Sequence, residues 1–400
     1  MPPPPPIDTT TPALVLSAQN YGCLGIIRSL GRLGVPVHAV DANPPRAAAY
    51  SRYLTARHVF DLAAATPEAT VDYLLDLGRR LGGRTVLIPT WDQTSLLASD
   101  YADALGEWYI FPRQPPGLAR ALADKRSMHF LARQHGVPTP DVVFPEGVDD
   151  VARFAATAVF PVMLKAIDGN RLKLRTGLKM VIVNDPDELV RRYVAMEDPD
   201  EPNLMLQEFI PGGEHDVWMF NGYFDHASDA LMGFTGRKLR QSPVYTGVTS
   251  LGVCQANESV RETTTRWMKA IGYRGILDIG YRFDARDGQY KVLDANPRIG
   301  ATFRLFVAKG GLDVARAMYL DLTGQPVPDA EPVEGRRWMV EGADVDSALQ
   351  YRRDGKLTAF DWASSLIGVR ETAYFARDDL APFRVALRGF VRRKSDGGAD

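Results

Sequence analysis

The first 120 residues alternate short apolar strands with helices, and this alternation limits the fold more than any other feature of the sequence. Ala13 to Ser17, Val35 to Val40 and Val86 to Ile88 are apolar runs typical of buried strands. Between them, apolar residues recur at the spacing of a helix. Because strands that alternate with helices form parallel sheets, we expect a parallel α/β domain over residues 12–120.

A glycine-bearing turn joins the first strand of this domain to its helix. The turn contains Gly22 and Gly25, which invites a dinucleotide-binding interpretation, although the full Gly-x-Gly-x-x-Gly pattern is missing. A tight strand-to-helix turn is the plainer interpretation. Ligands bind at the carboxyl ends of parallel strands, so Asn20 and Asp92 are candidates for contact with a substrate.

From about residue 121 the rhythm changes to a mixed α+β pattern. Asp124 is placed to cap a helix over residues 125–135, which Gly136 ends. A strongly basic stretch at 168–179 then lies between two strand-like runs, and we interpret it as a flexible loop. Further strands are expected at 159–165, 179–183, 204–209, 217–220, 276–283 and 289–293, and helices at 186–196 and 258–271. Residues 331–400 suggest a helical subdomain and tail, and the proline-rich residues 1–11 a disordered tail.

Composition excludes several functional classes. A formal charge of -2 and a pI near 6.3 leave no basic footprint for nucleic acid or a membrane surface. Cys23 and Cys254 are the only cysteines, and they lack the spacing of a metal site. No apolar run approaches the roughly 20 residues of a membrane helix. We therefore expect a cytoplasmic protein of two or three lobes, without nucleic-acid or membrane partners.

Two acids share one face of a predicted hairpin. If its turn is centred on Arg286, Asp278 faces Asp294, and Asn296 lies on the same face. Carboxylates opposite each other in a sheet repel, and a divalent cation removes that repulsion. Oxygen ligands of this kind suit Mg²⁺, whereas a solvated hairpin face with incidental acids is the plainer alternative.

Cations and a strand edge precede this hairpin. Lys165 ends an apolar strand, and the basic stretch 168–179 after it could close over a polyphosphate or be a solvated hairpin tip. Residues 207–210 form a strand that leads into a Pro-Gly-Gly turn. Its backbone edge could contact an adenine ring, and Glu214 could accept from ribose hydroxyls.

Taken in this order, the motifs resemble those of the ATP-grasp superfamily. Asp124-Lys125, which opens a predicted helix, also matches the family pattern. D-alanine–D-alanine ligase and carbamoyl-phosphate synthetase share the outline, and the nearest branch is that of the carboxylate–amine ligases, which includes D-aspartate ligase. The resemblance covers about residues 12–320. It implies a pre-grasp domain at 12–120, an ATP-grasp domain at 121–330 and a C-terminal subdomain at 331–400. The nucleotide lobe would span about 121–205 and the metal and substrate lobe about 206–330.

The resemblance also implies a role for each motif residue. Lys125, Lys165 and Arg171 would hold ATP phosphates, and Arg298, Lys165 and Arg240 would form the catalytic set. The adenine and ribose contacts would come from Gln207, Glu208, Phe209, Ile210 and Glu214, and the ligands of Mg²⁺, or of Mn²⁺ in its place, from Asp278, Asp294 and Asn296. Two positions depart from the family pattern, because Asp294 and Gln207 stand where Glu is usual.

The activity implied is that of an ATP-dependent ligase. It would activate a carboxylate as an acyl phosphate, join it to an amine, and release ADP and phosphate. The alternatives are another ATP-grasp reaction, such as that of a carboxylase or a kinase-like enzyme, and a non-catalytic ATP-binding regulator. Small carboxylates and amines, as in amino acids or short peptides, are the expected substrates, and a homodimer is a family-level expectation. Arg240 and Arg304 could hold substrate carboxylates or be surface arginines.

Overall fold

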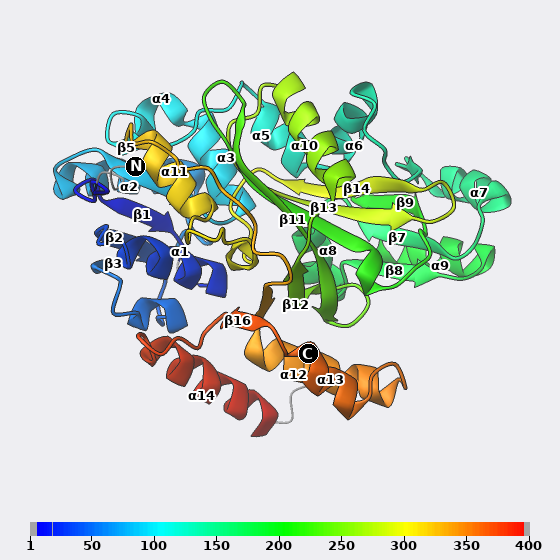
Figure 1. Ribbon diagram of the computed structural model, residues 1–400. Coiled ribbons are helices and arrows are strands. Elements are labelled where there is room, and N and C mark those ends of the chain that lie inside the picture. Colours follow the sequence, from blue (N-terminus) through cyan, green and yellow to red (C-terminus); the bar gives the residue numbers. More distant parts are fainter. Residues whose placement is uncertain (1–5, 18, 396–400) are drawn as a thin grey trace. The chain divides into compact units, whose positions relative to one another are not determined.

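The computed structural model describes residues 6–17 and 19–395, and the chain divides into two compact units. The first unit comprises Met1–Ala119, Glu214–Ile279 and Asn296–Asp400, and the second comprises Arg120–Gly213 and Gly280–Ala295 (Figure 1). Each unit is therefore built from separate stretches of sequence. The four-part division expected from the sequence stays a prediction.

A five-stranded parallel sheet forms the start of the first unit. Its strand order is β3-β2-β1-β4-β5, so β1 lies in the middle, as expected for a doubly wound α/β sheet. The strands are β1 (Ala13–Leu16), β2 (Val37–Asp41), β3 (Ala56–Val59), β4 (Thr85–Pro89) and β5 (Tyr109–Ile110). The helical elements are α1 (Tyr21–Gly31), η1 (Ala47–Tyr50), α2 (Pro67–Leu81), α3 (Asp92–Asp100) and α4 (Ala102–Leu105).

Gly22 and Gly25, which the sequence suggested for a turn, lie in the first part of α1, and packing within the chain explains both. Asn20 caps α1 by accepting from the N–H of Cys23 at 3.1 Å. A Cβ at Gly22 would lie 2.7 Å from the Cα of Ala301, and the site of Gly25 is equally close to Phe303. Close packing within the chain accounts for both glycines, which favours the plainer interpretation of a tight strand-to-helix turn.

A second, largely antiparallel sheet completes the first unit. It belongs to the seven-stranded order β14-β13-β10-β11-β12-β15-β16, in which the neighbours from β10 to β15 pair antiparallel and β15 pairs with β16 in parallel. The mixture of parallel and antiparallel sheets confirms the predicted fold class. The strands are β10 (Val217–Phe224), β11 (Ala230–Ser242), β12 (Val248–Cys254), β13 (Gly275–Asp284), β15 (Arg337–Met339) and β16 (Val369–Thr372), with helical elements η2 (Glu214–Asp216), α10 (Glu258–Ala270), η3 (Phe303–Leu305) and α11 (Val314–Leu322).

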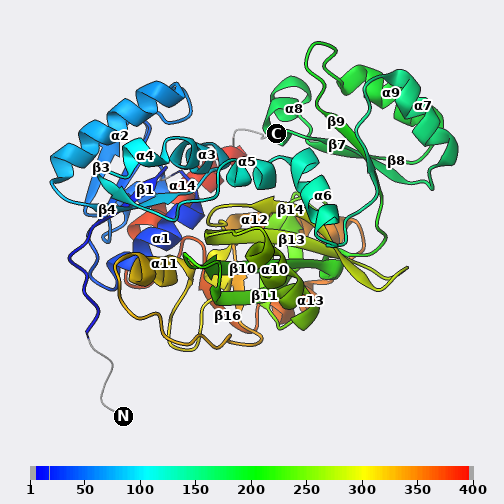
Figure 2. The same cartoon turned by 90° about the horizontal axis from the view of Figure 1, so that it is seen from above.

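The second unit holds an antiparallel sheet of order β6-β9-β7-β8. Helices α7 and α9 lie together beside this sheet (Figure 2), where they share a core with the buried residues of β7. The strands are β6 (Val142–Val143), β7 (Val162–Ala166), β8 (Met180–Val183), β9 (Leu204–Glu208) and the returning β14 (Gln289–Asn296); the helices are α5 (Leu118–Ala123), which begins in the first unit, α6 (Lys125–Gln134), α7 (Val148–Thr157), α8 (Gly169–Thr176) and α9 (Pro186–Met196).

Helix α8 corrects one expectation, because the basic stretch 168–179 was interpreted as a flexible loop. The Oδ1 of Asp168 accepts from the N–H of Arg171 at 3.2 Å, as a capping residue does. Leu172 is 2% exposed and belongs to the core shared with α7 and α9. The buried side chain of Leu172 and the cap at Asp168 stabilise the helix. The many charged residues of the stretch favoured a loop when the sequence was read alone.

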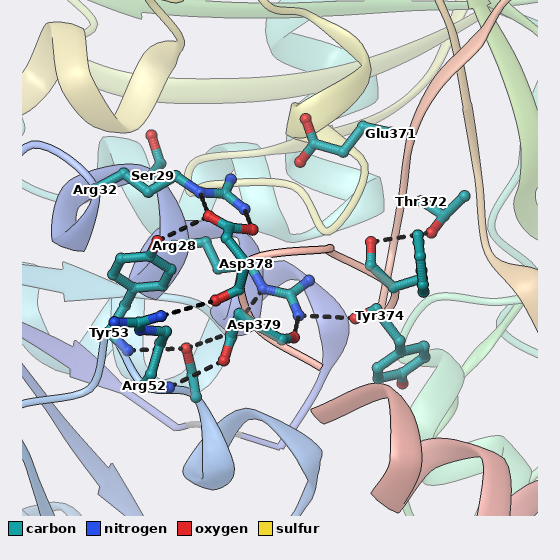
Figure 3. Close-up of polar contacts among 12 residues, drawn as sticks. Arg28, Ser29, Arg32, Arg52, Tyr53, Glu371, Thr372, Tyr374, Asp378 and Asp379 are labelled. Carbon is teal, nitrogen blue, oxygen red and sulfur yellow. Dashed lines mark hydrogen bonds and ion pairs between the residues drawn. The ribbon is translucent and has the colours of Figure 1, made fainter. Parts of the chain in front are cut away.

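The segment after β16 is bound to α1 within the first unit (Figure 3). Arg28 Nε donates to Asp379 Oδ2 at 2.9 Å, and its Nη2 donates to the carbonyl of Tyr374 at 2.7 Å. Asp379 also accepts from the hydroxyl of Ser51 and the N–H of Arg52. Both charged side chains are buried, and we call this group the Arg28–Asp379 clasp. The remaining helices of the first unit are α12 (Glu341–Arg353), α13 (Ala359–Ser365) and α14 (Ala381–Ser395).

The described part of the amino-terminal segment is held by the first unit. Asp8 exchanges hydrogen bonds with Gln325, and the hydroxyl of Tyr319 donates to the carbonyl of Thr11 at 2.8 Å. Residues 1–5 of the predicted tail lie outside the described residues. Among the residues that the structure describes, no helix has both the length and the apolar character needed to cross a bilayer.

Candidate functional site

Two lysines lie close together in the second unit. Lys125 is the first residue of α6, and Asp124 caps that helix by accepting from the N–H of Ser127 at 2.8 Å. The Nζ of Lys125 donates to the carbonyl of Ile167 at 2.7 Å. Lys165 lies on β7, where alternation sends its neighbours into the core and Lys165 to the opposite face.

The electrostatics of this pair suit an anion. Burial and the charge of Lys125 together lower the pKa of Lys165 to about 8, against the opposing charge of Asp294. Burial also lowers the pKa of Lys125. Within the described residues, no carboxylate forms an ion pair with either lysine. Two adjacent cations that form no ion pair with a carboxylate of the described residues are what the phosphates of ATP would neutralise, so these residues fit the nucleotide.

The predicted adenine contacts lie along β9 and just after it. Gln207 is 4% exposed, and its Nε2 lies 3.6 Å from the sulfur of Met163. The carbonyl of Ile210 accepts from Arg282 Nε at 2.9 Å, which fixes the backbone after the strand. Phe209 lies between the two, partly exposed. These contacts place the predicted adenine segment on a fixed strand, and its role stays a prediction.

Glu208 differs from its neighbours, because the chain already uses its carboxylate. It accepts from the N–H of Asp141 at 3.0 Å and from the ammonium of Lys291 at 3.0 Å, and it pairs with Arg286. Burial alone would raise the pKa of Glu208, but these hydrogen bonds bring it below its ordinary value. Glu208 therefore ties β14 to the sheet of the second unit.

Glycines accommodate the two predicted metal-binding acids, each within its own unit. In the first unit, a Cβ at Gly300 would lie 2.7 Å from Oδ1 of Asp278. In the second unit, a Cβ at Gly280 would lie 2.6 Å from Oδ1 of Asp294. Any larger residue would displace these carboxylates.

Asn296 and Arg298 lie in the first unit, as Asp278 does. The Nδ2 of Asn296 donates to the carbonyl of Asp278 at 3.1 Å, and its Oδ1 accepts from Arg298 Nη2 at 3.2 Å. No group of three or more His, Cys, Asp or Glu residues suited to a metal occurs in the part of the chain that the structure describes. Carboxylate and amide oxygens are hard ligands of the kind that suits Mg²⁺, which keeps waters among its ligands, and the predicted set of Asp278, Asp294 and Asn296 stays a prediction.

Arg240 forms a buried ion pair within the chain, and its predicted catalytic role stays a prediction. Arg240 is 4% exposed, and its Nε and Nη2 donate to the two carboxylate oxygens of Asp344 at 2.8 Å each. Its Nη1 donates to Ser365 at 2.7 Å. A substrate carboxylate would have to displace this buried pair, which is costly because it leaves Asp344 without its counter-charge.

Three other candidates are also engaged by the chain. Arg304 is buried between Asp313 and Glu371, with Nε donating to Glu371 at 2.8 Å, so it is not the surface arginine that the sequence allowed. Arg171 pairs with Glu201, although it lies on α8 in the second unit. Glu214 accepts from the hydroxyl of Tyr351 at 2.7 Å in the first unit.

Sequence reasoning missed an aromatic group beside Asp278. The ring of Tyr21, the first residue of α1, contacts those of Trp338 and Tyr374, with centroids 5.6 and 6.1 Å away. Burial raises the pKa of Tyr21 to about 12, and the charge of Asp278 adds to that rise. Tyr21 is more than 300 positions away from Trp338 and Tyr374 in the sequence, so no local pattern could have indicated the group.

Known proteins with similar sequences are ligases and carboxylases. No protein-family model matches the chain. D-aspartate ligase from Enterococcus faecium is 25% identical over 289 residues, which cover 68% of this chain and 67% of that enzyme. Carbamoyl phosphate synthase large chains also match but are far longer, and the chain spans 30% of the one from Halobacterium salinarum.

Solved structures share the fold at low sequence identity. N5-carboxyaminoimidazole synthetase from Staphylococcus aureus superposes with a TM-score of 0.65 at 13% identity, covering 87% of both chains. L-amino acid ligase from Bacillus licheniformis gives a TM-score of 0.61 at 16% identity, covering 82% of this chain and 79% of that one.

Proposed function

Taking as premise that the chain belongs to the ATP-grasp superfamily, we propose that it is an ATP-dependent ligase that joins a carboxylate to an amine. The observation that carries this proposal is the pair Lys125 and Lys165, two adjacent cations without a carboxylate partner among the described residues. The names of the relatives support C–N bond formation in particular, because a D-aspartate ligase and an L-amino acid ligase are among them.

The chemistry follows from what a carboxylate lacks. A carboxylate is a poor electrophile, because its negative charge repels nucleophiles and oxide is a poor leaving group. A carboxylate oxygen therefore first attacks the γ-phosphorus of ATP, and ADP departs. The amine then attacks the acyl carbon of the resulting acyl phosphate, loses a proton, and phosphate departs. Such transfers need positioning and charge neutralisation more than covalent help from the protein.

The residues divide this work between them. Lys125 and Lys165 hold phosphate oxygens, and Arg298 stabilises the charge on the transferring group. When bound through Asp278, Asp294 and Asn296, Mg²⁺ supplies further neutralisation of the phosphates. Residues 207–210, where β9 ends, contact the adenine. The substrates are small carboxylates and amines such as amino acids, and we place the enzyme in the cytoplasm as a homodimer.

The test is release of ADP and phosphate in the presence of amino acids offered singly and in pairs, with products weighed by mass spectrometry. Release that requires both a carboxylate and an amine, with formation of an amide, is the expected result. Release that requires bicarbonate or a single substrate would favour a carboxylase or a kinase-like enzyme. Binding of ATP without turnover would favour a regulator and overturn the proposal.

A further inference from the structure

The first turn of helix α3 forms hydrogen bonds with the loop that follows β14, and both lie in the first unit. Asp92 and Ser95 are three residues apart on this helix, so their side chains share one face. The hydroxyl of Ser95 donates to the carbonyl of Pro297 at 2.7 Å, and Asp92 Oδ1 accepts from Arg298 Nε at 2.7 Å. Two consecutive residues of the loop are thus held by one helical turn.

A chain of hydrogen bonds leads from Asp92 to the predicted metal ligands. Arg298 Nη2 donates to Oδ1 of Asn296 at 3.2 Å, and Nδ2 of Asn296 donates to the carbonyl of Asp278 at 3.1 Å. Each end of the Asn296 amide has a partner of the matching kind, so its orientation is set. The direction in which Asn296 offers its oxygen depends on Arg298, and that of Arg298 on Asp92.

The ion pair itself does little for stability. The side chain of Asp92 is 50% exposed and that of Arg298 is 18% exposed, and exposed pairs of this kind contribute little to folding. Arg298 uses one further N–H on the carbonyl of Ile299 at 3.3 Å. Of the five N–H groups of a guanidinium, two remain for phosphoryl oxygens. The pair therefore orients Arg298 while leaving it able to bind an anion.

We propose that Asp92 is a positioning residue, which acts through Arg298 to orient both the guanidinium and the amide oxygen of Asn296. This inference rests on the proposed function, in which Arg298 contacts the transferring phosphoryl group. The loss of Asp92 misdirects Arg298 without touching the lysines of the second unit. Its effect falls on kcat, and the KM for ATP stays unchanged.

The experiment is a double-mutant cycle with Asp92→Ala and Arg298→Ala, read as ADP release in the amino-acid pair assay. Asp92→Ala lowers kcat by about tenfold or more, as misplacement of a catalytic group does, with the KM for ATP within about twofold of the wild-type value. In the Arg298→Ala background the same change has no further effect. Asp92→Asn keeps an acceptor for Nε and retains part of the activity.

Asp103→Ala is the matched control, because Asp103 is an exposed acid of the same unit whose partner is Arg113. It leaves kcat unchanged. Equal losses from Asp92→Ala in both backgrounds, or no loss in either, would overturn the proposal.

A second measurement separates this proposal from the proposed function. In protein labelled with ¹⁵N-arginine, the Nε–H signal of Arg298 is protected from solvent exchange in the wild type and loses that protection in Asp92→Ala. Protection that survives in Asp92→Ala would overturn the positioning role. A wild-type protein with this protection but without ligation would instead overturn the proposed function.

Discussion

At the residue scale, the absence of a side chain at Gly300 decides where Asp278 can place its carboxylate. A Cβ at Gly300 would lie 2.7 Å from Oδ1 of Asp278, and the backbone of Gly300 is not left-handed, so an alanine meets no conformational penalty there. Gly300→Ala should therefore displace Asp278, cost about 1–3 kcal/mol of stability by overpacking, and lower ADP release severely. Thermal unfolding and the amino-acid pair assay measure the two effects.

Gly310→Ala is the control for this change, because no atom lies within 4 Å of the position of its Cβ. It should leave both unfolding and activity unchanged. A Gly300→Ala protein with full activity would show that the position of Asp278 does not matter for the reaction.

Lys165 should make ATP binding depend on pH. Its pKa is lowered from 10.5 to about 8 by burial and by Lys125, so its charge is present below pH 8 and is lost as the pH rises through that value. Because the charged form attracts phosphates, wild-type affinity for ATP should fall between pH 7 and 9. Lys165→Met should bind ATP weakly at pH 7 and lose this dependence, which isothermal titration calorimetry measures.

Lys309→Met is the matched control, because Lys309 is exposed and paired with Glu331. Its affinity for ATP and its pH dependence should equal those of the wild type. An affinity of the wild type that is constant from pH 7 to 9 would contradict the assignment of Lys165 to the phosphates.

At the element scale, the sequence predicted those elements whose signals are local. Asp124 capped its helix as expected, and α9 and α10 lie where periodicity indicated. Strands β11 and β12 were missed, because Gly233, Gly236 and the basic residues from Arg237 interrupt the alternation. A register irregularity between Lys238 and Arg240 interrupts it further. Their strand state depends on pairing with neighbours, which a local pattern does not contain.

Helix α8 offers a direct comparison of two leucines. Leu172 is 2% exposed in the core of the second unit, whereas Leu174 on the same helix is 91% exposed. Leu172→Ala should lower the free energy of unfolding by about 2–4 kcal/mol, and Leu174→Ala by less than about 0.5 kcal/mol. Urea unfolding measures both. If 169–176 were a flexible loop, the two variants would behave alike.

At the scale of the whole molecule, the Arg28–Asp379 clasp joins positions 351 residues apart. Asp379→Asn should lower the free energy of unfolding by about 3–5 kcal/mol, because it leaves the buried guanidinium of Arg28 without a counter-charge. Asp378, its neighbour, pairs with Arg32 at 2.9 Å on the surface. Asp378→Asn should therefore cost about 1 kcal/mol or less. Equal shifts in thermal unfolding for Asp379→Asn and Asp378→Asn would show that the clasp contributes no more to stability than the exposed ion pair.

The candidate site shows the same limit on sequence reasoning at this larger scale. Motif order led to Lys125, Lys165, Asp278 and Asn296, because each carries a local signal: a helix cap before Lys125, an apolar strand ending near Lys165, and one face of a hairpin for Asp278 and Asn296. The engagement of Arg240 by Asp344 was not visible, since the two are 104 residues apart and are brought together only by tertiary packing. A buried partner decides whether an arginine is available to a ligand, and the partner cannot be read from the arginine's own surroundings in sequence.

The clasp also governs the order in which the molecule can be completed during synthesis. Ribosomes release α1 long before Asp379, so the newly made helix carries Arg28 while no counter-charge yet exists for it. In the same way, the hydroxyl of Ser29 cannot donate to Asp313, its partner at 2.6 Å, until Asp313 has been synthesised. The contact between Arg28 and Asp379 can therefore form only after residue 379 has left the ribosome.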